Sequence, residues 1–266
     1  MLADALARLD IAADIRLIDD AGRVAEGKAL DIMQAAPVEG FSTDVSGSSD
    51  MATAGGAALV VIADRVRGAE WQGEDGLMLL KRVTPLASPA PILCAGASQR
   101  ELVDRGVREL HVSRERLFGT ATEALAGGAR ALVALAIDAS PRDIALSVLG
   151  VPPSQIVIPW EDATSAGFAL TRMIDEPARR RLVARISLLW PPGPYALAAA
   201  AAKAAGAMFG RTRAVVSCFV APDDSEGERK RTAALPARLN LRGIERVVCP
   251  ELNGADRVAF DNAMLL

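Results

Sequence analysis

Residues 15–50 read IRLIDDAGRVAEGKALDIMQAAPVEGFSTDVSGSSD, and this stretch decides the fold of the chain. It opens with a short apolar run, Ile15 to Ile18, that ends at the carboxylate of Asp19. A buried parallel strand whose carboxyl end meets a ligand has this form. A helix from Glu26 and a turn at Pro37 and Val38 are predicted to follow. In a sheet that binds a dinucleotide, an acid placed like Asp19 accepts hydrogen bonds from the ribose hydroxyls.

Strands and helices alternate through the rest of the N-terminal half. Continuous apolar runs predict buried strands, and apolar residues at helical spacing predict the helices between them. We expect Pro85 and Pro89 to bound the first of these helices. The alternation predicts an α/β fold with a Rossmann-like, doubly wound parallel sheet. The predicted strands cover residues 57–63, 91–96 and 117–119, and the predicted helices cover residues 74–83, 98–107 and 122–137.

The chain begins with a helical pattern, Leu2 to Leu9, that leads directly into the Ile15 strand. In a doubly wound sheet, a strand and a Gly-rich turn precede such a helix, and the sequence contains neither. Either the start codon is assigned too late or the gene has lost the segment. We favour the first explanation, because a sheet without its central strand leaves apolar surface and backbone donors unpaired.

The pattern changes after Ser140 and Pro141. The short turn between the next two predicted strands favours antiparallel pairing. We therefore divide the chain into a truncated dinucleotide-binding domain, residues 1–140, and an α+β substrate domain, residues 141–266. The predicted strands of the second domain are 144–149, 155–158, 214–220, 237–241 and 244–248, and its predicted helices are 175–190, 195–209 and 256–266.

The bulk composition excludes several classes of partner. The 266 residues carry a net charge of -3, which gives no reason to expect nucleic acid or an anionic membrane as partner. No apolar stretch is long enough to span a bilayer, and Met1 to Leu9 does not resemble a signal peptide. Cys94, Cys218 and Cys249 show no paired spacing. We expect them to be buried free thiols in a reducing cytoplasm.

Several segments resemble the lactate/malate dehydrogenase family, particularly its bacterial malate dehydrogenases. The resemblance is clearest after Asp19, where strand, acid, helix and Pro-Val turn follow in a fixed order, and it extends from the first helix to the last residue. The segments that carry it are Glu26 to Ile32, Ala36 to Phe41, Leu59 to Leu77, Leu117 to Val148, Ser187 to Val220 and Gly243 to Val248.

The resemblance implies NAD as cofactor and hydride transfer between malate and oxaloacetate as the family reaction. It assigns Asp19 to the cofactor ribose. It assigns Arg67 and Arg130 to the carboxylates of a small dicarboxylate or 2-oxo acid, because a planar guanidinium binds a carboxylate with two parallel bonds. Surface charge is the alternative explanation for both arginines. Family members also associate through broad helical faces, which implies a homo-oligomer, either a dimer or a tetramer.

The residues that handle the proton depart from the family pattern. Family members place the acid–base histidine in a Gly-His-Gly turn, and the matching turn here contains Pro152. The aspartate that orients the histidine matches Gly127 or Gly128, and the asparagine near ribose and substrate matches Gly96. We expect the only histidine, His111, to be a surface residue.

Three functions remain open. The first is a malate dehydrogenase-like protein that is weakly active or inactive, because general acid–base help is worth roughly 10²–10⁴-fold in rate. The second is a non-catalytic scaffold that pairs with itself or with an active paralogue. The third is an enzyme of different chemistry with Glu74, Asp75 or Glu123 as base, although carboxylates in such loops are more often solvated.

Overall fold

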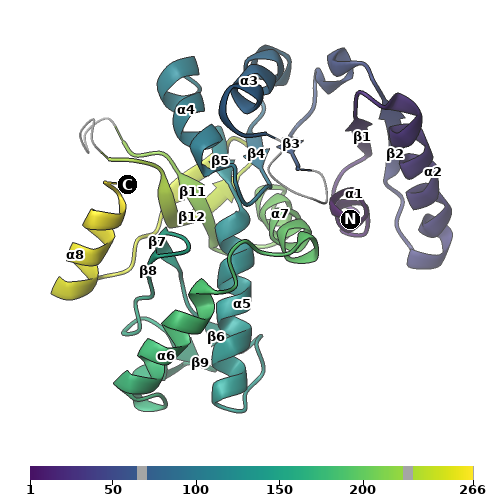
Figure 1. Cartoon of the computed structure of the whole chain (residues 1–266). Helices are drawn as coiled ribbons and strands as arrows, with labels where there is room; N and C mark the ends of the chain where they lie inside the picture. Colours follow the sequence, from purple (N-terminus) through teal and green to yellow (C-terminus); the bar gives the residue numbers. More distant parts are fainter. Residues whose placement is uncertain (65–70, 224–229, 266) are drawn as a thin grey trace.

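The computed structural model describes residues 1–64, 71–223 and 230–265, and its central feature is one long mixed sheet (Figure 1). The sheet has the strand order β3-β4-β5-β11-β12-β7-β8, and β13 pairs with β12. The first three strands are parallel, as the alternating pattern predicts. They and their connecting helices are β3 (Val60–Ile62), α3 (Gly73–Ala87), β4 (Ile92–Cys94), α4 (Arg100–Leu110) and β5 (Leu117–Gly119).

Helices cover both faces of the parallel part of this sheet. Along β4, Ile92 and Cys94 pack in one apolar cluster with residues of α3 and α4. Leu93 points the other way and joins a cluster that contains alanines of α7 (Pro194–Met208). Successive side chains of a strand point to opposite faces, so a strand covered on both sides must be apolar throughout. The chain therefore has the predicted α/β, Rossmann-like architecture.

The antiparallel strands of the second half extend the same sheet. β11 pairs with β5 through Phe219 and Gly119, and β7 pairs with β8 across the short turn that predicted an antiparallel pair. The predicted strand over residues 144–149 is instead two strands, of which the first belongs to a small separate sheet. The strands are β6 (Ile144–Ala145), β7 (Leu149–Val151), β8 (Gln155–Val157), β9 (Thr164–Ser165), β10 (Phe168–Ala169), β11 (Val216–Val220), β12 (Ala233–Asn240) and β13 (Gly243–Val247).

Two long helices, α5 (Ala121–Ala136) and α6 (Glu176–Ser187), form a lobe with the small sheet (Figure 1). The helix α5 starts directly after β5, so it runs from the parallel part of the main sheet into this lobe. The last helix, α8 (Gly254–Ala263), packs beside β7 and β8. Because β5 and β11 are neighbours, the main sheet crosses residue 140, and the domain division there stays a prediction.

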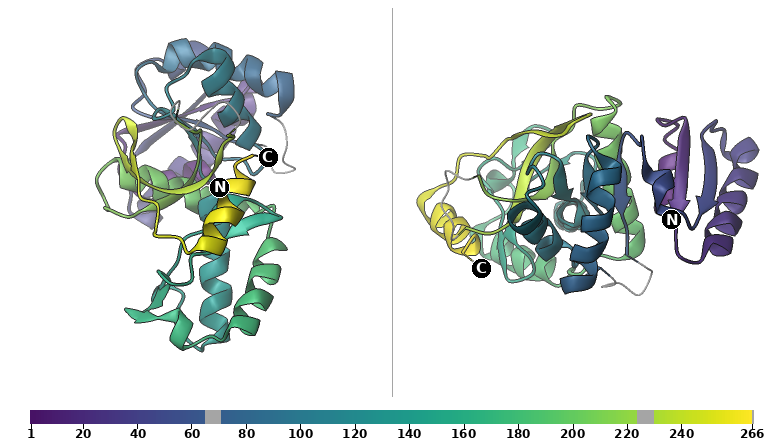
Figure 2. Two further views of the ribbon diagram at one scale, coloured as in Figure 1. Left: turned by 90° about the vertical axis from the view of Figure 1, so that its left-hand side faces the viewer. Right: turned by 90° about the horizontal axis from the view of Figure 1, so that it is seen from above.

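The first two strands form a sheet of their own. β1 (Asp14–Ile18) and β2 (Asp44–Ser48) pair in parallel, and among the described residues neither pairs with β3. Figure 2 shows this pair, with its helix, at one end of the molecule. Arg16 links β1 to the segment before β3, because its Nη1 donates to the carbonyls of Thr53 and Gly55 at 2.9 and 3.3 Å. Helix α1 (Leu2–Ala7) joins the pair to the main body by packing against α7.

The predicted turn at Pro37 and Val38 is wrong. Both residues lie in the last turn of α2 (Gly22–Glu39), which ends at Gly40 in the left-handed conformation with φ of 77°. The Gly40 amide donates to the carbonyl of Ala36 at 2.8 Å. A proline in the final turn disturbs few helical bonds, and glycine adopts the left-handed region without strain. Glycine, not proline, therefore ends this helix.

Pro85 likewise lies inside a helix and does not bound it. Helix α3 continues to Ala87, because Leu80, Val83 and Ala87 bury one continuous face. Pro85 has no N–H to donate, but it stands in the last turn, where one missing bond costs little. The adjacent Thr84 hydroxyl donates to the Leu80 carbonyl at 2.7 Å. Burial of the apolar face outweighs the local preference of proline.

Alanine dominates α7 because this helix lies in the core of the subunit. Residues of α7 that are buried include Ala198, Ala201, Ala204 and Ala205. Small side chains allow the helix to approach the main sheet and α5 closely. Packing within the subunit therefore accounts for the Ala-rich sequence.

The expectation of three buried thiols holds for two of them. Cys94 and Cys218 are buried in strands, whereas Cys249 is exposed because it follows the end of β13. Burial raises the pKa of the Cys94 thiol to about 12 and also raises the pKa of Cys218. Among the described helices, none combines the length and the apolarity that a membrane span requires.

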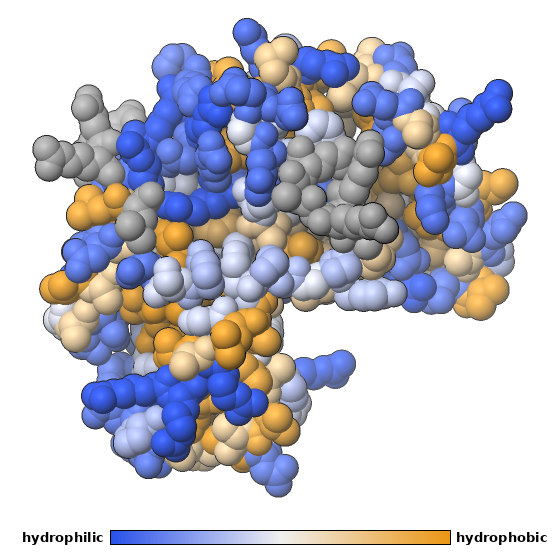
Figure 3. Space-filling view, viewed as in Figure 1, coloured by the Kyte–Doolittle hydropathy of each residue, from blue (hydrophilic) through white to orange (hydrophobic). Residues whose placement is uncertain are grey.

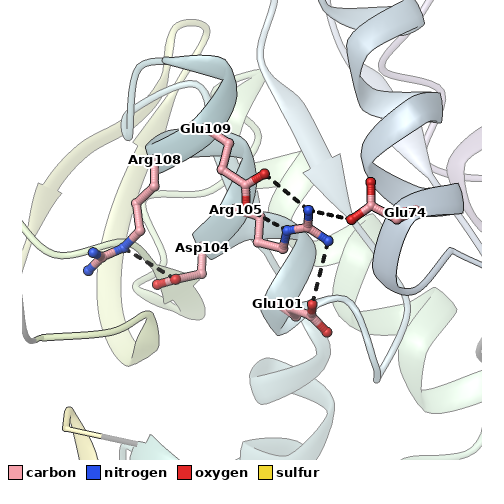
Figure 4. Close-up of polar contacts among 6 residues, drawn as sticks. All are labelled: Glu74, Glu101, Asp104, Arg105, Arg108 and Glu109. Carbon is pink, nitrogen blue, oxygen red and sulfur yellow. Dashed lines mark hydrogen bonds and ion pairs between the residues drawn. The ribbon is translucent and has the colours of Figure 1, made fainter.

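An ion-pair network on the surface joins α3 to α4 (Figure 4). The guanidinium of Arg105 contacts Glu74 of α3 at 2.7 Å and Glu109 of α4 at 2.6 Å, and Glu101 lies 3.8 Å away. Arg105 holds the pKa of the Glu109 carboxyl below its usual value, chiefly through a side-chain hydrogen bond, while burial partly opposes this effect. The contact between Arg105 and Glu109 within α4 therefore depends on pH.

Replacing Arg105 with alanine should flatten the acid side of the stability profile. A carboxyl with a lowered pKa contributes stability at neutral pH that is lost as pH falls through its folded-state value. We expect Arg105→Ala to lower the unfolding midpoint at about pH 7, and to lower it progressively less as the pH falls from there. Arg180→Ala, which removes an isolated pair with Glu176 on α6, is the matched control. An Arg105→Ala profile parallel to wild type would contradict the network.

Candidate functional site

Asp19 stands at the carboxyl end of β1, as the sequence predicts. Its amide donates to the Ser48 carbonyl at 3.1 Å, which continues the pairing of β1 with β2. Its Oδ1 accepts the amide of Ala21 at 2.8 Å and so fixes the turn that leads into α2. Within the described chain, Oδ2 has no hydrogen-bond partner. The carboxylate is held in place and keeps one oxygen for a ligand hydroxyl.

Asp64 occupies the equivalent position at the end of β3, and the sequence analysis did not identify it. Its carboxylate accepts Gln99 Nε2 at 3.0 Å, and it also lies 3.4 Å from the Trp71 amide and from the Ser98 hydroxyl. An acid directly after an apolar strand was the signal that singled out Asp19, and the same signal was present here. These hydrogen bonds join the segment after β3 to the segment after β4.

The Asp64 network explains why position 96 is glycine. A Cβ built on Gly96 would lie 2.1 Å from Asp64 Oδ2 and 2.8 Å from the Gln99 amide carbon. Gln99 is itself fixed, because its Oε1 accepts the Gly96 amide at 2.8 Å. A side chain at this position would have to displace the Asp64 carboxylate and the Gln99 amide from their hydrogen bonds. The asparagine that the family resemblance would place here therefore does not fit the present arrangement of these two side chains.

The proline turn lies between β7 and β8. Pro152 is buried and Pro153 is exposed. Gly127 lies in the middle of α5, where an added Cβ would meet only the Arg130 Nη2 atom, at 3.9 Å. A Cβ added to Gly128 would lie 2.6 Å from Leu189 Cδ1. Position 127 therefore has space for a side chain that the sequence does not provide.

Arg130 is already bonded to a carboxylate of its own helix. Its Nη2 donates to Glu123 Oε1 at 2.5 Å, and Lys203 Nζ of α7 reaches the same oxygen at 2.6 Å. The Ser217 amide of β11 donates to Glu123 Oε2 at 2.8 Å. The Glu123 side chain is only 2% exposed, against 21% for Arg130 and 37% for Lys203. Lys203 is the lone charged residue in an alanine run, and this isolated charge was the sequence signal for a buried acidic partner, here Glu123.

A cavity of about 440 Å³ lies beside this cluster. Glu123, Arg130 and Ser217 line it together with Asp162 and several apolar residues. Asp19, Gly127 and Pro152 are not among its lining residues. The cavity thus belongs to the Glu123 cluster, and the structure does not bring Arg130 together with Asp19 at one cavity.

The remaining predicted residues fall into three groups. Arg67 lies outside the described residues. His111 is exposed and ends α4 in the left-handed conformation with φ of 53°. Of the alternative bases, Glu74 pairs with Arg105, Asp75 is exposed, and Glu123 is buried between two cations. Over residues 1–64, 71–223 and 230–265, no group of three or more His, Cys, Asp or Glu side chains could hold a metal ion.

Comparison with known proteins gives a consistent result. No model of a known protein family matches the sequence. The malate dehydrogenase of Desulforudis audaxviator is 27% identical over 279 residues, which cover 94% of this chain and 87% of that protein. The malate dehydrogenase of Thioalkalivibrio sulfidiphilus is also 27% identical, over 98% of this chain and 91% of its own length.

Solved structures of the same kind of enzyme match the fold. The malate dehydrogenase of Salinibacter ruber superposes with a TM-score of 0.87 at 21% identity, over 98% of this chain and 89% of that one. The chain is therefore similar to malate and lactate dehydrogenases in its sequence and in its fold. The lactate dehydrogenase of Cryptosporidium parvum, solved with lactic acid and β-nicotinamide adenine dinucleotide, matches with a TM-score of 0.86 at 20% identity, over 98% and 90% of the two chains.

The residues that the structure describes fit only part of a dinucleotide. Asp19 offers a fixed carboxylate with a free oxygen, which suits the ribose hydroxyls of an adenosine. Asp64, the other carboxylate that follows a strand of the parallel part, is already bonded to Gln99. Of the two acids, Asp19 is thus the one that could accept a ribose hydroxyl.

Proposed function

We propose that this chain has the fold of a lactate/malate dehydrogenase but catalyses the family reaction inefficiently or not at all. The family reaction is NAD-dependent hydride transfer between malate and oxaloacetate. Pro152 carries the proposal, because it is buried in the β7–β8 turn where the resemblance expects the acid–base histidine. A proline side chain has no proton to give or take. Bound NADH would supply the hydride to oxaloacetate, but neither Pro152 nor its neighbour Pro153 can donate the accompanying proton.

The ligands we propose are weakly held. Asp19 would bind the adenosine ribose of NAD, and Arg67 and Arg130 would bind the carboxylates of a small dicarboxylate or 2-oxo acid. The bond between Arg130 and Glu123 supports weak substrate binding, since the guanidinium already has a carboxylate partner. We place the protein in the cytoplasm, where the free thiols of Cys94, Cys218 and Cys249 would stay reduced.

The turnover of oxaloacetate with NADH tests the catalytic part of the proposal. We expect an initial rate at least about 10²–10⁴-fold below that of the Salinibacter ruber enzyme under the same conditions, because acid–base help is absent. The loss of NADH absorbance measures both rates. His111→Ala is the control, and it should leave any residual rate unchanged because that side chain is exposed on α4. A rate that matches the active relative, or one that His111→Ala abolishes, contradicts the proposal.

The scaffold alternative has one specific observation in its favour. Large apolar side chains stay exposed on the lobe of α5 and α6, with Leu135 at 74%, Leu188 at 83% and Tyr195, at the start of α7, at 79% exposure. Figure 3 shows apolar side chains that interrupt the polar surface over this lobe. Exposed apolar patches of this kind often mark interaction surfaces. A homo-oligomer, either a dimer or a tetramer, or a pair with an active paralogue, would cover them.

Light scattering on purified protein tests this alternative. We expect a mass that is twice or four times the 27.8 kDa of one chain. The double variant Leu188→Asp with Tyr195→Asp should shift the population toward the monomer, because a buried charge in an apolar contact costs several kcal/mol. Val258→Asp on α8, another exposed apolar position, is the matched control. A wild-type monomer at every concentration would exclude self-association.

A further inference from the structure

The environment of Glu123 has the composition of a site for a bound carboxylate. Two cations, Arg130 and Lys203, and one backbone amide, that of Ser217, converge on its two oxygens at 2.5 to 2.8 Å. Charged and amide donors around an anion in this way are the arrangement by which proteins bind carboxylate ligands. The donors come from three elements, α5, α7 and β11.

The site is also open to its surroundings. Arg130 and Lys203 share the Glu123 carboxylate as their ion-pair partner, and Asp162 lines the adjoining cavity. Both cationic side chains are partly exposed, whereas the Glu123 side chain is almost fully buried. The cavity of about 440 Å³ opens beside Arg130 and Ser217 and has room for a small organic acid.

We propose that Glu123 is a resident carboxylate that occupies an anion site of this chain. In the wild-type protein the Glu123 carboxylate competes with any ligand for these donors, so a ligand carboxylate binds there only weakly. Removal of the Glu123 carboxylate opens it to a small monocarboxylate such as acetate. The inference concerns binding alone and needs neither NAD nor turnover, so its failure and the failure of the proposed function are distinguishable.

A purely structural role for Glu123 makes a different prediction. If Glu123 only holds α5, α7 and β11 together, its loss should destabilise the protein equally in every salt at the same ionic strength. If the donors form an anion site, a carboxylate added to the solution should replace the missing side chain. An anion that binds only the folded state raises the unfolding midpoint with its concentration.

The experiment measures thermal unfolding of Glu123→Ala in sodium acetate and in sodium chloride at equal ionic strength. Alanine leaves a space for acetate between Arg130, Lys203 and the Ser217 amide. We expect acetate to raise the midpoint of this variant by about 2–4 °C over chloride, and to change the wild-type midpoint by less than about 1 °C. Glu123→Gln keeps the volume of the side chain, so the space stays filled and acetate should have little effect on it.

A control variant and a second measurement decide between the two roles of Glu123. Glu74→Ala removes an exposed carboxylate from Arg105, and acetate should not rescue it, because no enclosed site is left there. If Glu123→Ala does not stay folded, its refolding yield by circular dichroism is compared in the two salts, and a higher yield in acetate supports the site. Equal midpoints or equal yields in acetate and chloride would overturn the proposal, as would an equal acetate response of wild type.

Discussion

Replacing Gly47 with alanine should lower the free energy of unfolding by about 1–3 kcal/mol or more. Gly47 lies in β2, directly under α2, and a Cβ there would be 2.2 Å from the amide nitrogen of Glu26 and 2.3 Å from the carbonyl carbon of Ala25. Both are backbone atoms of α2, so no side-chain rotation can relieve the overlap. The helix must move away from the strand, and the small core beneath it must open.

Equilibrium unfolding in denaturant measures the effect, and Gly27→Ala is the matched control. Gly27 lies on the same helix, but an added Cβ meets no atom within 4 Å. Alanine is the better helix former by roughly 1 kcal/mol, so this variant should be at least as stable as wild type. If Gly47→Ala were also as stable as wild type, α2 could not pack on β2 as described.

The second large effect concerns the edge of β3 and β4. Gly96→Asn should destabilise the protein by about 1–3 kcal/mol, because the new side chain overlaps the Asp64 carboxylate and the Gln99 amide. Asparagine is the residue that the family resemblance would place at this position. The variant therefore tests whether Asp64 and its hydrogen bonds take the place of an asparagine at the edge of β3 and β4.

A double-mutant cycle separates the overlap from other effects. Asp64→Ala removes the atom that lies 2.1 Å from the built Cβ, so the double variant Gly96→Asn with Asp64→Ala should recover part of the lost stability. We expect a coupling free energy of about 0.5–3 kcal/mol between positions 64 and 96, as for residues in direct contact. Additive losses would show that Asp64 does not exclude a side chain at position 96.

The architecture was predictable because its signals are periodic. The apolar runs at β3, β4 and β5 predicted buried parallel strands, and the short turn after β7 predicted an antiparallel pair. The errors fall at Pro37 and Pro85, where a local preference of proline was given more weight than burial. Tertiary packing overrides such preferences in the last turn of a helix, and a single sequence does not show how much of the helix is buried.

The site was harder to predict because its contacts join distant positions. Asp19 follows a pattern within one strand, so the sequence was sufficient to place it. Glu123 and Lys203 are 80 residues apart and meet only because α5 packs against α7. Arg130 was expected to bind a substrate carboxylate, which stays a prediction, and in the structure it bonds to Glu123 of its own helix.

A single-turnover experiment tests the central claim most directly, namely that this fold has been kept without its proton-handling group. The protein is mixed in excess over NADH, and the binding of NADH is first measured by thermal shift against Asp19→Ala, which should lose that shift. Oxaloacetate is then added and the absorbance of NADH is followed. We predict that NADH stays reduced on the timescale in which an active relative completes one turnover. Prompt oxidation of the bound NADH, whether or not His111→Ala abolishes it, would contradict the account.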